Sequence, residues 1–197
     1  MGRVRRPPRE ELVARFASGR SFLDVGALWS VHGAIAFAAR DAGATRVTAL
    51  DIMAPTSQFA QCQGDVRFVQ GDVHDPATVA AAGAHDVVWC SGVLYHAPHP
   101  LLTLRRLHEL TGETLLLATE TIRGRGRRCT FAPGPGAHPA RPGLFAPAHG
   151  YGNWWWGLSR SAVMAMVEAS GFAVAERHWT RHHLTLVAHK IVNADRI

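Results

Sequence analysis

The sequence lacks any apolar run near the ~20 residues that a membrane-spanning helix needs, so we expect no membrane partner. Its basic start, MGRVRRPPRE, has no apolar segment of the kind that secretory signals carry. Cysteine is scarce: Cys62, Cys90 and Cys129 are far apart and odd in number, which excludes a disulfide framework and a zinc knuckle. These absences together predict a cytoplasmic protein.

Lysine is almost missing, because Lys190 is the single lysine among 21 basic residues and the others are arginine. The net charge is nevertheless +6, and the arginines gather at Arg3–Arg9 and Arg123–Arg128. Either cluster could meet an acidic partner or RNA phosphates. The alternative is a solvated tail and a mobile loop, and both interpretations stay open.

Histidine is plentiful, with 12 residues, but no closed set of metal ligands with a known spacing occurs. His96 and His99 flank a proline, and His182 and His183 are adjacent on a predicted strand, where they point in opposite directions. We therefore expect no metal site.

Apolar periodicity divides the chain of 197 residues, 47% of them hydrophobic, into alternating strands and helices. Helices are predicted over residues 10–17, 30–42, 77–82, 100–110 and 160–170. Strands are predicted over residues 21–25, 46–50, 66–70, 86–90, 114–119, 173–179 and 184–188. This order predicts one α/β domain over residues 1–197, a Rossmann-like doubly wound sheet of about seven strands. The sheet should be mostly parallel, with a C-terminal antiparallel hairpin and helices on both faces.

Two segments fall outside this alternation. Residues 1–8 are rich in proline and arginine, and we expect a disordered tail. Residues 122–153 are dense in glycine, proline and arginine and show no sustained period. Because a loop of this length in a compact domain is usually a lid, a binding loop or disordered, we expect a substrate lid.

The stretch from Ser21 to Asp51 reads as strand, glycine turn, helix, strand. Gly26 stands where the first strand ends, and Asp51 stands where the second ends. In a parallel sheet both points lie at the carboxyl edge, where ligands bind at the switch in strand order. The stretch therefore predicts a site for a nucleoside cofactor.

The glycines that a dinucleotide needs are missing from this stretch. Its turn reads Gly26-Ala27-Leu28-Trp29-Ser30, whereas close approach to a pyrophosphate requires the pattern G-x-G-x-x-G. Leucine replaces the second glycine, and tryptophan adds bulk beside it. A dehydrogenase is therefore disfavoured, and a cofactor without phosphates fits better.

Four segments carry a family resemblance: LDVGALWS, ALDI, VQGDVHD and DVVWCSGVLYHAPHPLLTLRRL. Over residues 20–120 the chain resembles the class I S-adenosylmethionine-dependent methyltransferases. It looks especially like the enzymes that transfer a carboxymethyl group to the wobble uridine of tRNA, and like their small-molecule relatives. The segment NWWWGLSRSAVMAMVEASGF is also similar to this wider group. The departure lies at Ala27-Leu28 and Ser30, where the family usually has two further glycines.

The resemblance implies S-adenosyl-L-methionine as the cofactor. Asp51 would accept both ribose hydroxyls, Asp72 would bind the adenine amino group, and Asp24 would hold the loop that carries Gly26. Asp72 could instead merely cap the next turn. The full set of implied cofactor-binding residues is Asp24, Gly26, Ala27, Leu28, Asp51, Ile52, Asp72, Val73, Ser91, Gly92 and Val93.

Methyl transfer from a sulfonium needs chiefly an aligned nucleophile, and a base matters only where the acceptor must lose a proton early. The candidate catalytic residues are His96, Tyr95 and Glu120, and His96 is preferred because an unperturbed histidine titrates near neutrality. Tyr95 and His96 could instead simply cover the cofactor.

The expected acceptor pocket is aromatic. The candidate substrate-binding residues are His99, Tyr151, Trp154 and Trp155, whose flat surfaces suit a small or planar acceptor. The alternative is that these tryptophans pack as core under the loop.

Three functions follow from these residues. The first is methyl transfer by in-line displacement to an O or N atom of a small or planar acceptor. The second is an RNA (tRNA) modifying methyltransferase or carboxymethyltransferase that uses the two arginine clusters. The third is a non-catalytic protein that binds S-adenosylmethionine as a partner or regulatory subunit. No segment indicates an oligomeric state.

Overall fold

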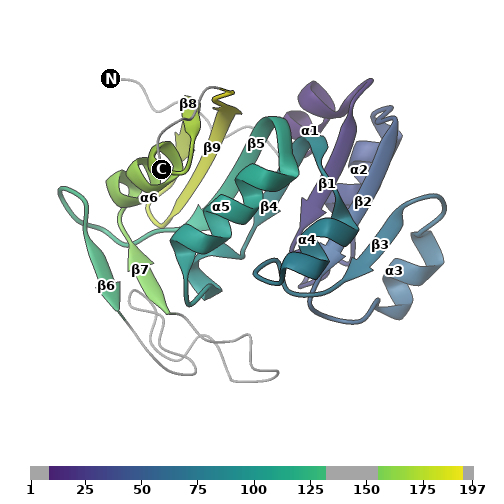
Figure 1. Cartoon of the computed structure of the whole chain (residues 1–197), viewed down its shortest axis with the longest axis horizontal. Coiled ribbons are helices and arrows are strands. Elements are labelled where there is room, and N and C mark those ends of the chain that lie inside the picture. The colour runs from purple at the N-terminus through teal and green to yellow at the C-terminus, as the bar shows by residue number, and fades with distance from the viewer. Residues whose placement is uncertain (1–8, 132–154, 193–197) are drawn as a thin grey trace.

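A computed structural model describes residues 9–131 and 155–192. Its centre is a seven-stranded sheet in the order β3-β2-β1-β4-β5-β9-β8 (Figure 1). Its strands are β1 (Ser21–Val25), β2 (Arg46–Asp51), β3 (Arg67–Gln70), β4 (His85–Ser91), β5 (Thr111–Glu120), β8 (Phe172–Trp179) and β9 (His183–Lys190). The first five strands are parallel to one another, and β9 pairs antiparallel with both β5 and β8. The predicted fold class and the C-terminal hairpin are confirmed.

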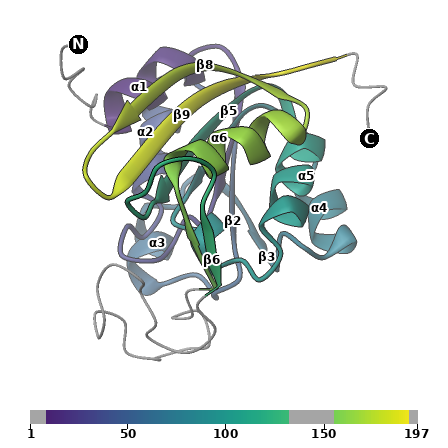
Figure 2. The ribbon, with the colours of Figure 1, turned by 90° about the vertical axis from the view of Figure 1, so that its left-hand side faces the viewer.

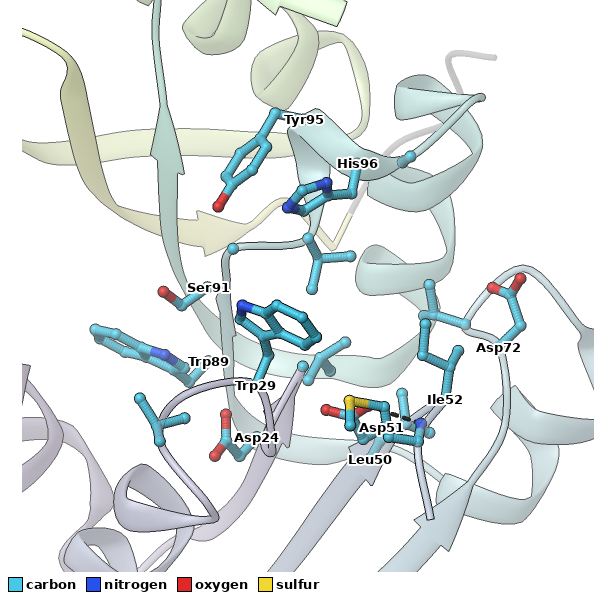
Figure 3. A pocket seen from close by; sticks show the side chains of 18 of the residues that line it. Asp24, Trp29, Leu50, Asp51, Ile52, Asp72, Trp89, Ser91, Tyr95 and His96 are labelled. Carbon is cyan, nitrogen blue, oxygen red and sulfur yellow. Dashed lines mark hydrogen bonds between the residues drawn. The ribbon is translucent and has the colours of Figure 1, made fainter. Parts of the chain in front are cut away.

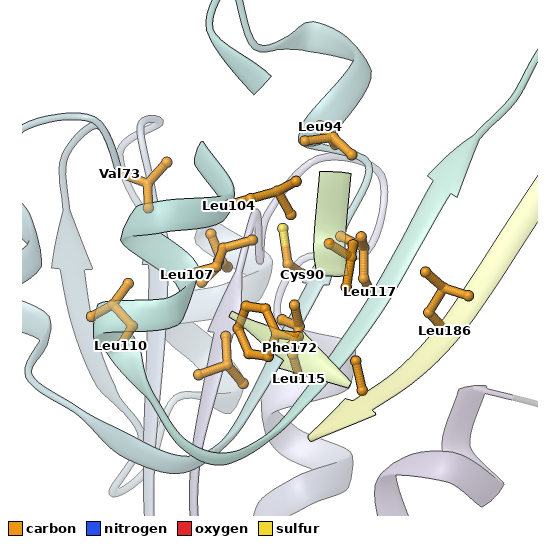
Figure 4. Close-up of a cluster of buried hydrophobic side chains, with 14 of the residues drawn as sticks. Val73, Cys90, Leu94, Leu104, Leu107, Leu110, Leu115, Leu117, Phe172 and Leu186 are labelled. Carbon is orange, nitrogen blue, oxygen red and sulfur yellow. The ribbon is translucent and has the colours of Figure 1, made fainter. Parts of the chain in front are cut away.

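Six α-helices cover the two faces of the sheet in the described part of the chain (Figures 1 and 2). One face carries α1 (Arg9–Ala17), α2 (Ala34–Asp41) and α3 (Ser57–Cys62), whose apolar side chains pack into one buried cluster. The other carries α4 (Pro76–Ala82), α5 (Pro100–Leu110) and α6 (Arg160–Ala169), which pack into a second (Figure 4). A short 3₁₀ helix, η1 (Leu94–His96), follows β4. The sheet is therefore covered on both faces, as parallel strands require.

The helix starts that sequence chemistry predicts are present. The Asp75 carboxylate accepts a hydrogen bond from the Ala77 amide at 2.9 Å, with Pro76 in the first helical position of α4. The Ser159 hydroxyl accepts one from the Ala162 amide at 3.3 Å at the start of α6. These caps satisfy amides that the first turn of a helix leaves unpaired.

Helix α5 spans the predicted residues, but only part of its leucine repeat is buried. Leu104, Leu107 and Leu110 are fully buried, whereas Leu101 is 48% exposed. At 3.6 residues per turn Leu101 lies about 120° around the helix from Leu107, so the two cannot share one narrow face. The buried face of α5 is therefore narrower than the leucine repeat indicates.

Helix α2 begins at Ala34, four residues later than predicted. The loop before it holds four residues with positive φ, namely Gly26 at 80°, Ser30 at 61°, His32 at 47° and Gly33 at 86°. At Gly33 a Cβ atom would stand 2.4 Å from Cδ2 of Phe59, so only glycine fits there. The longer loop leaves Trp29 in irregular chain at the carboxyl edge of the sheet.

A small hairpin was not predicted. Strands β6 (Cys129–Phe131) and β7 (Trp156–Leu158) form a separate two-stranded antiparallel sheet. β6 lies inside the segment predicted to be irregular, because a three-residue strand whose partner is distant in the chain shows no periodicity. The rest of the expected lid, residues 132–153, and the expected tail, residues 1–8, lie outside the described residues.

The chain at the start of β7 is joined by one hydrogen bond to η1 and by a second to the loop that follows η1. The Trp155 amide donates to the Tyr95 carbonyl at 3.2 Å, and the Trp156 indole Nε1–H donates to the Pro98 carbonyl at 3.0 Å. The 3₁₀ helix is thus held from both β4 and the hairpin. Across residues 9–131 and 155–192, no helix combines the length and apolarity needed to cross a bilayer.

His85 at the start of β4 should make stability depend on pH. The ring is 1% exposed, with Nδ1 2.9 Å from the Gly83 carbonyl and Nε2 2.9 Å from the Thr48 hydroxyl. Burial lowers the pKa of His85 from 6.5 to about 4, so the folded protein binds fewer protons than the unfolded chain between these values. The contribution of His85 to the free energy of unfolding should therefore be lost as the pH falls from 6.5 to 4.

The measurement is urea unfolding of the wild type and of His85→Gln at pH 7.5, 6, 5 and 4. The difference in stability between the two proteins should shrink toward low pH, because glutamine carries no titrating ring. His189→Gln, at an exposed histidine, is the control and should show a constant difference. A constant difference for His85→Gln as well would contradict the prediction.

Candidate functional site

A cavity of about 500 Å³ opens at the carboxyl ends of β1, β2 and β4 (Figure 3). In the sheet order, β1 lies between β2 and β4, and the chain crosses over in opposite directions from it. This is the switch point at which ligands bind in open α/β sheets. The cavity therefore lies where the glycine turn and the acid of residues 21–51 predict a site.

Most of the predicted cofactor-binding residues line this cavity. They are Asp24, Gly26, Asp51, Ile52, Asp72, Val73, Ser91, Gly92 and Val93. Ala27 and Leu28 do not line it, since both side chains are buried beneath the loop. Leu28 acts through its backbone, because its amide donates to the Asp51 carboxylate at 2.8 Å.

Asp51 ends β2 with both carboxylate oxygens in use. Oδ2 accepts the Leu28 amide at 2.8 Å, and Oδ1 accepts the Met53 amide at 2.9 Å. Burial raises the pKa of Asp51, while the amides of Met53 and Leu28 act in the opposite direction. A carboxylate has about four acceptor positions, so two remain for donors from a ligand in the cavity.

Asp24 on β1 is the more deeply buried acid, only 2% exposed. Within the described residues its Oδ2 has no hydrogen-bond partner. Burial, followed by the nearby charge of Asp51, raises the pKa of Asp24 from 3.8 to about 7. An orphaned buried oxygen at a cavity wall is a position that a cationic or N–H group of a ligand would satisfy.

Gly26 allows the ends of β1 and β4 to meet. Its φ is +80°, and a Cβ atom there would stand 2.6 Å from Cγ2 of Val93 and 3.1 Å from the Ser91 carbonyl oxygen. No other residue fits without moving backbone. The glycine keeps the cavity wall thin where the two strand ends touch.

Asp72 combines the two roles that its position in the sequence allows. Its Oδ1 accepts the His74 amide at 2.8 Å, and its carbonyl accepts the Asp75 amide at 3.0 Å, so it does build the turn before α4. It also lines the cavity, and its side chain is 59% exposed. No hydrogen bond to Oδ2 occurs among the described residues, so this oxygen can meet a ligand.

The catalytic candidates separate into two groups. Tyr95 and His96, on η1, line the cavity with ring centroids 4.2 Å apart. Glu120 does not line it, although its charge reaches Tyr95, and neither does His99, one of the substrate-binding candidates. Burial raises the pKa of Tyr95 to about 12, and Glu120 adds to this rise. The phenol is therefore protonated at neutral pH, so it can donate a hydrogen bond but cannot serve as a base.

Of the substrate-binding candidates, Trp155 lines the cavity, while Tyr151 and Trp154 lie outside the described residues. The two arginine clusters also differ. Arg9 of α1 lines the cavity, and its charge lowers the pKa of both Asp24 and Tyr95. The side chains of Arg123–Arg128 are exposed and do not line the cavity.

Several lining residues were not predicted. They include Arg9, Trp29, Met53, His74, Trp89 and Pro98. In the view of Figure 3, the indole of Trp29 lies between the acids of β1 and β2 and the rings of Tyr95 and His96. Trp89 lies within β4, whose apolar run indicated only a buried strand. The position of Trp29, directly after the glycine turn, was the one available clue.

The described residues contain no group of three or more histidine, cysteine or acidic side chains that could hold a metal ion. Acids line one end of the cavity, and aromatic rings line the other (Figure 3). Its acids suit hydroxyl, amino and cationic groups, and its rings suit a flat apolar ligand.

Comparison with known proteins bears on this arrangement. Residues 23–113 match a family model described as a methyltransferase domain. A search of curated proteins found no match.

Solved structures share the fold. The chain is similar to 1,6-didemethyltoxoflavin-N1-methyltransferase of Burkholderia thailandensis, with a TM-score of 0.68 and 19% identity over 93% of this chain and 77% of that one. It is also similar to magnesium protoporphyrin IX methyltransferase of Synechocystis PCC 6803, with a TM-score of 0.61 and 20% identity over 92% and 81%. A third is an S-adenosylmethionine-dependent methyltransferase from Mesorhizobium loti, with a TM-score of 0.64 and 14% identity over 93% and 98%. The first two contain bound S-adenosylhomocysteine.

Proposed function

Because residues 23–113 match a methyltransferase family model and the fold is shared with methyltransferases of solved structure, we propose that the chain is a class I S-adenosylmethionine-dependent methyltransferase that methylates a small, planar acceptor. The donor is S-adenosylmethionine, and the accepting atom is an oxygen or a nitrogen. One observation carries the proposal: a single cavity joins three acids at strand ends to Trp29, Tyr95, His96 and Trp155. The acids match the donor, and the rings match a flat acceptor.

Each of the three acids, which come from or follow three different strands, binds a different part of the cofactor. Asp51 accepts the ribose hydroxyls with the two acceptor positions that the Leu28 and Met53 amides leave open. Asp72 accepts the adenine amino group through Oδ2, beside the backbone of Val73. Asp24 faces the ammonium of the methionine part with its unpartnered oxygen, near Gly26.

The cofactor supplies a methyl group that its sulfonium already activates. The chain's own task is to align the acceptor and exclude water, and such alignment can lower a barrier by ~7–11 kcal/mol. Tyr95 donates a hydrogen bond to the acceptor, because its phenol stays protonated up to a pH of about 12. His96, beside it on the same 3₁₀ helix, takes the acceptor's proton.

The similar structures also support a small acceptor. Two of them are named for 1,6-didemethyltoxoflavin and magnesium protoporphyrin IX, which are small molecules rather than macromolecules. The exposed arginines at 123–128 favour the alternative, an RNA acceptor, because they could bind phosphates outside the cavity.

Calorimetric titration with S-adenosylmethionine, S-adenosylhomocysteine and NAD tests the donor. The two sulfur compounds should bind and NAD should not; the reverse result overturns the proposal. Release of S-adenosylhomocysteine is then measured with a panel of hydroxylated and amino-substituted aromatic heterocycles, and separately with bulk tRNA. Turnover with tRNA alone would favour the RNA-modifying alternative, and binding without turnover would favour a non-catalytic role.

His96→Asn should lower kcat by about 10²–10⁴-fold, which is the range that a positioned acid or base contributes. The dissociation constant of S-adenosylhomocysteine should stay the same, because none of the three acids is changed. Tyr95→Phe is the comparison, and it should cost only about tenfold, the loss of one hydrogen bond. If His96→Asn kept full kcat on an acceptor that must lose a proton, His96 would not be the base.

A further inference from the structure

A chain of hydrogen bonds runs from the buried side of α5 to the rim of the cavity. The Thr103 hydroxyl lies 2.7 Å from Nε2 of His74. Nδ1 of the same ring lies 3.2 Å from Oδ1 of Asp72, which also accepts the His74 amide at 2.8 Å. Asp72 is therefore held by His74 at two points, and His74 is held by Thr103.

Exposure rises in steps along this chain. Thr103 is fully buried and does not line the cavity. The His74 side chain is 18% exposed and the Asp72 side chain 59% exposed, and both residues line the cavity. A buried group on α5 therefore contacts a half-exposed acid only through a ring between them.

The protons of the chain have one consistent arrangement for a neutral ring. Oδ1 of Asp72 already accepts the His74 amide, so Nδ1 of His74 is the nitrogen that carries the proton and donates it to this oxygen. Nε2 must then accept, and the Thr103 hydroxyl is its donor. That hydroxyl has a second acceptor in reach, the His99 carbonyl at 3.2 Å, but the ring nitrogen is closer. Thr103 thus selects the tautomer of His74 that can hold Asp72.

We propose that His74 and Thr103 are positioning residues that fix the Asp72 carboxylate for the amino group of the cofactor's base. Oδ1 is fully used by His74, which directs the remaining oxygen, Oδ2, toward the base. The selection of adenine over a base with an oxo group in place of the amino group then depends on a buried threonine that never touches the cofactor. The inference rests on the proposed function, since it assumes that the base lies at Asp72.

The test compares two probes, S-adenosylhomocysteine and S-inosylhomocysteine, which carries an oxo group in place of the adenine amino group. Wild type should prefer the first, because an ionised Asp72 repels the oxo group. Thr103→Val keeps the shape of the side chain and removes the hydroxyl. It should weaken S-adenosylhomocysteine by about 5–10-fold, the loss expected when one hydrogen bond to a charged network goes, and change S-inosylhomocysteine by less than about twofold.

Thr103→Ser restores the hydroxyl and should restore the preference to within about twofold of wild type. Thr114→Val, at another buried threonine that does not line the cavity, should change neither affinity. In an Asp72→Ala background, Thr103→Val should have no further effect on either probe, because the group that it positions is gone.

Equal weakening of both probes by Thr103→Val would overturn the proposal, because a purely structural role moves both. An unchanged preference in Thr103→Val would also overturn it. Failure of the proposed function gives a different result, since wild type itself would then bind neither probe.

Discussion

Asp51→Ala should weaken the binding of S-adenosylhomocysteine by about 100-fold or more. The ribose hydroxyls of the ligand would lose two hydrogen bonds to a charged acceptor, each worth about 1.5–3 kcal/mol. Every 1.4 kcal/mol of binding free energy corresponds to about a tenfold change in affinity. The change also removes the acceptor of the Leu28 amide in the loop after β1 and of the Met53 amide in the loop after β2. Isothermal titration calorimetry at pH 7.5 measures the effect.

Two variants separate recognition from folding. Asp51→Asn keeps the shape and one acceptor oxygen and should bind more tightly than Asp51→Ala, though still at least about tenfold more weakly than wild type. Asp65→Ala removes an exposed acid on the loop before β3 and should change nothing. If Asp51→Ala bound S-adenosylhomocysteine as tightly as wild type, the assignment of the ribose to Asp51 would be wrong.

Asp24→Asn should make the ligand-free protein more stable and the cofactor complex weaker. The pKa of Asp24 is about 7 in the fold, against 3.8 ordinarily, so ionising this acid in the folded protein is costly. The raised pKa stabilises the folded protein at low pH. This stabilisation is fully present below about pH 4 and is lost as the pH rises through 7. The wild type therefore carries the cost of a buried charge at pH 8 and above.

Asparagine removes that cost, because it has nearly the shape of aspartate and no charge to bury. At pH 8.5 the variant should gain roughly 3–4 kcal/mol in free energy of unfolding, from about three pKa units at 1.36 kcal/mol each. The gain should shrink as the pH falls through 7 toward 4 and vanish at about pH 3, where Asp24 is protonated in both states. Urea unfolding across this range measures it, with Asp65→Asn, at an exposed acid, as the control.

The same variant should bind S-adenosylhomocysteine about 10–100-fold more weakly at pH 8, since the partner of the ammonium has lost its charge. The free energy of unfolding would then rise while the affinity for the ligand falls. This is expected where a charge that destabilises the ligand-free protein also binds the ligand. A variant that lost stability at pH 8.5 and kept its affinity would show that Asp24 is merely a structural acid.

Much of the sheet and the acidic end of the cavity could be predicted from short-range patterns. The strand from Ser21 to Val25 and the helix from Pro100 to Leu110 have the predicted bounds, because each is a continuous periodic run. Asp75 and Ser159 cap the predicted helices, because a cap is a contact between residues two or three positions apart. Asp51 lines the cavity because it ends a strand of a parallel sheet, in which the carboxyl ends of all strands lie at the same edge.

What the patterns missed depends on contacts between distant residues. Strands β6 and β7 pair across more than 20 residues and are too short to show a period. Helix α2 starts late because Gly33 lies against Phe59 of another helix. Leu101, part of a regular leucine repeat, is exposed because the neighbouring elements cover only one narrow side of α5.

The amino-acid sequence alone was enough to predict a doubly wound sheet with Gly26 and Asp51 at one edge, where they line the same cavity. Strand alternation, helix caps and a glycine turn are local, so the chain encodes them within a few residues. Two other features could be learned only from the folded chain: Arg9, Trp29 and Trp89 line the same cavity, and Thr103 contacts His74, which contacts Asp72. These groups come from separate elements, and their meeting follows from how the helices pack on the sheet.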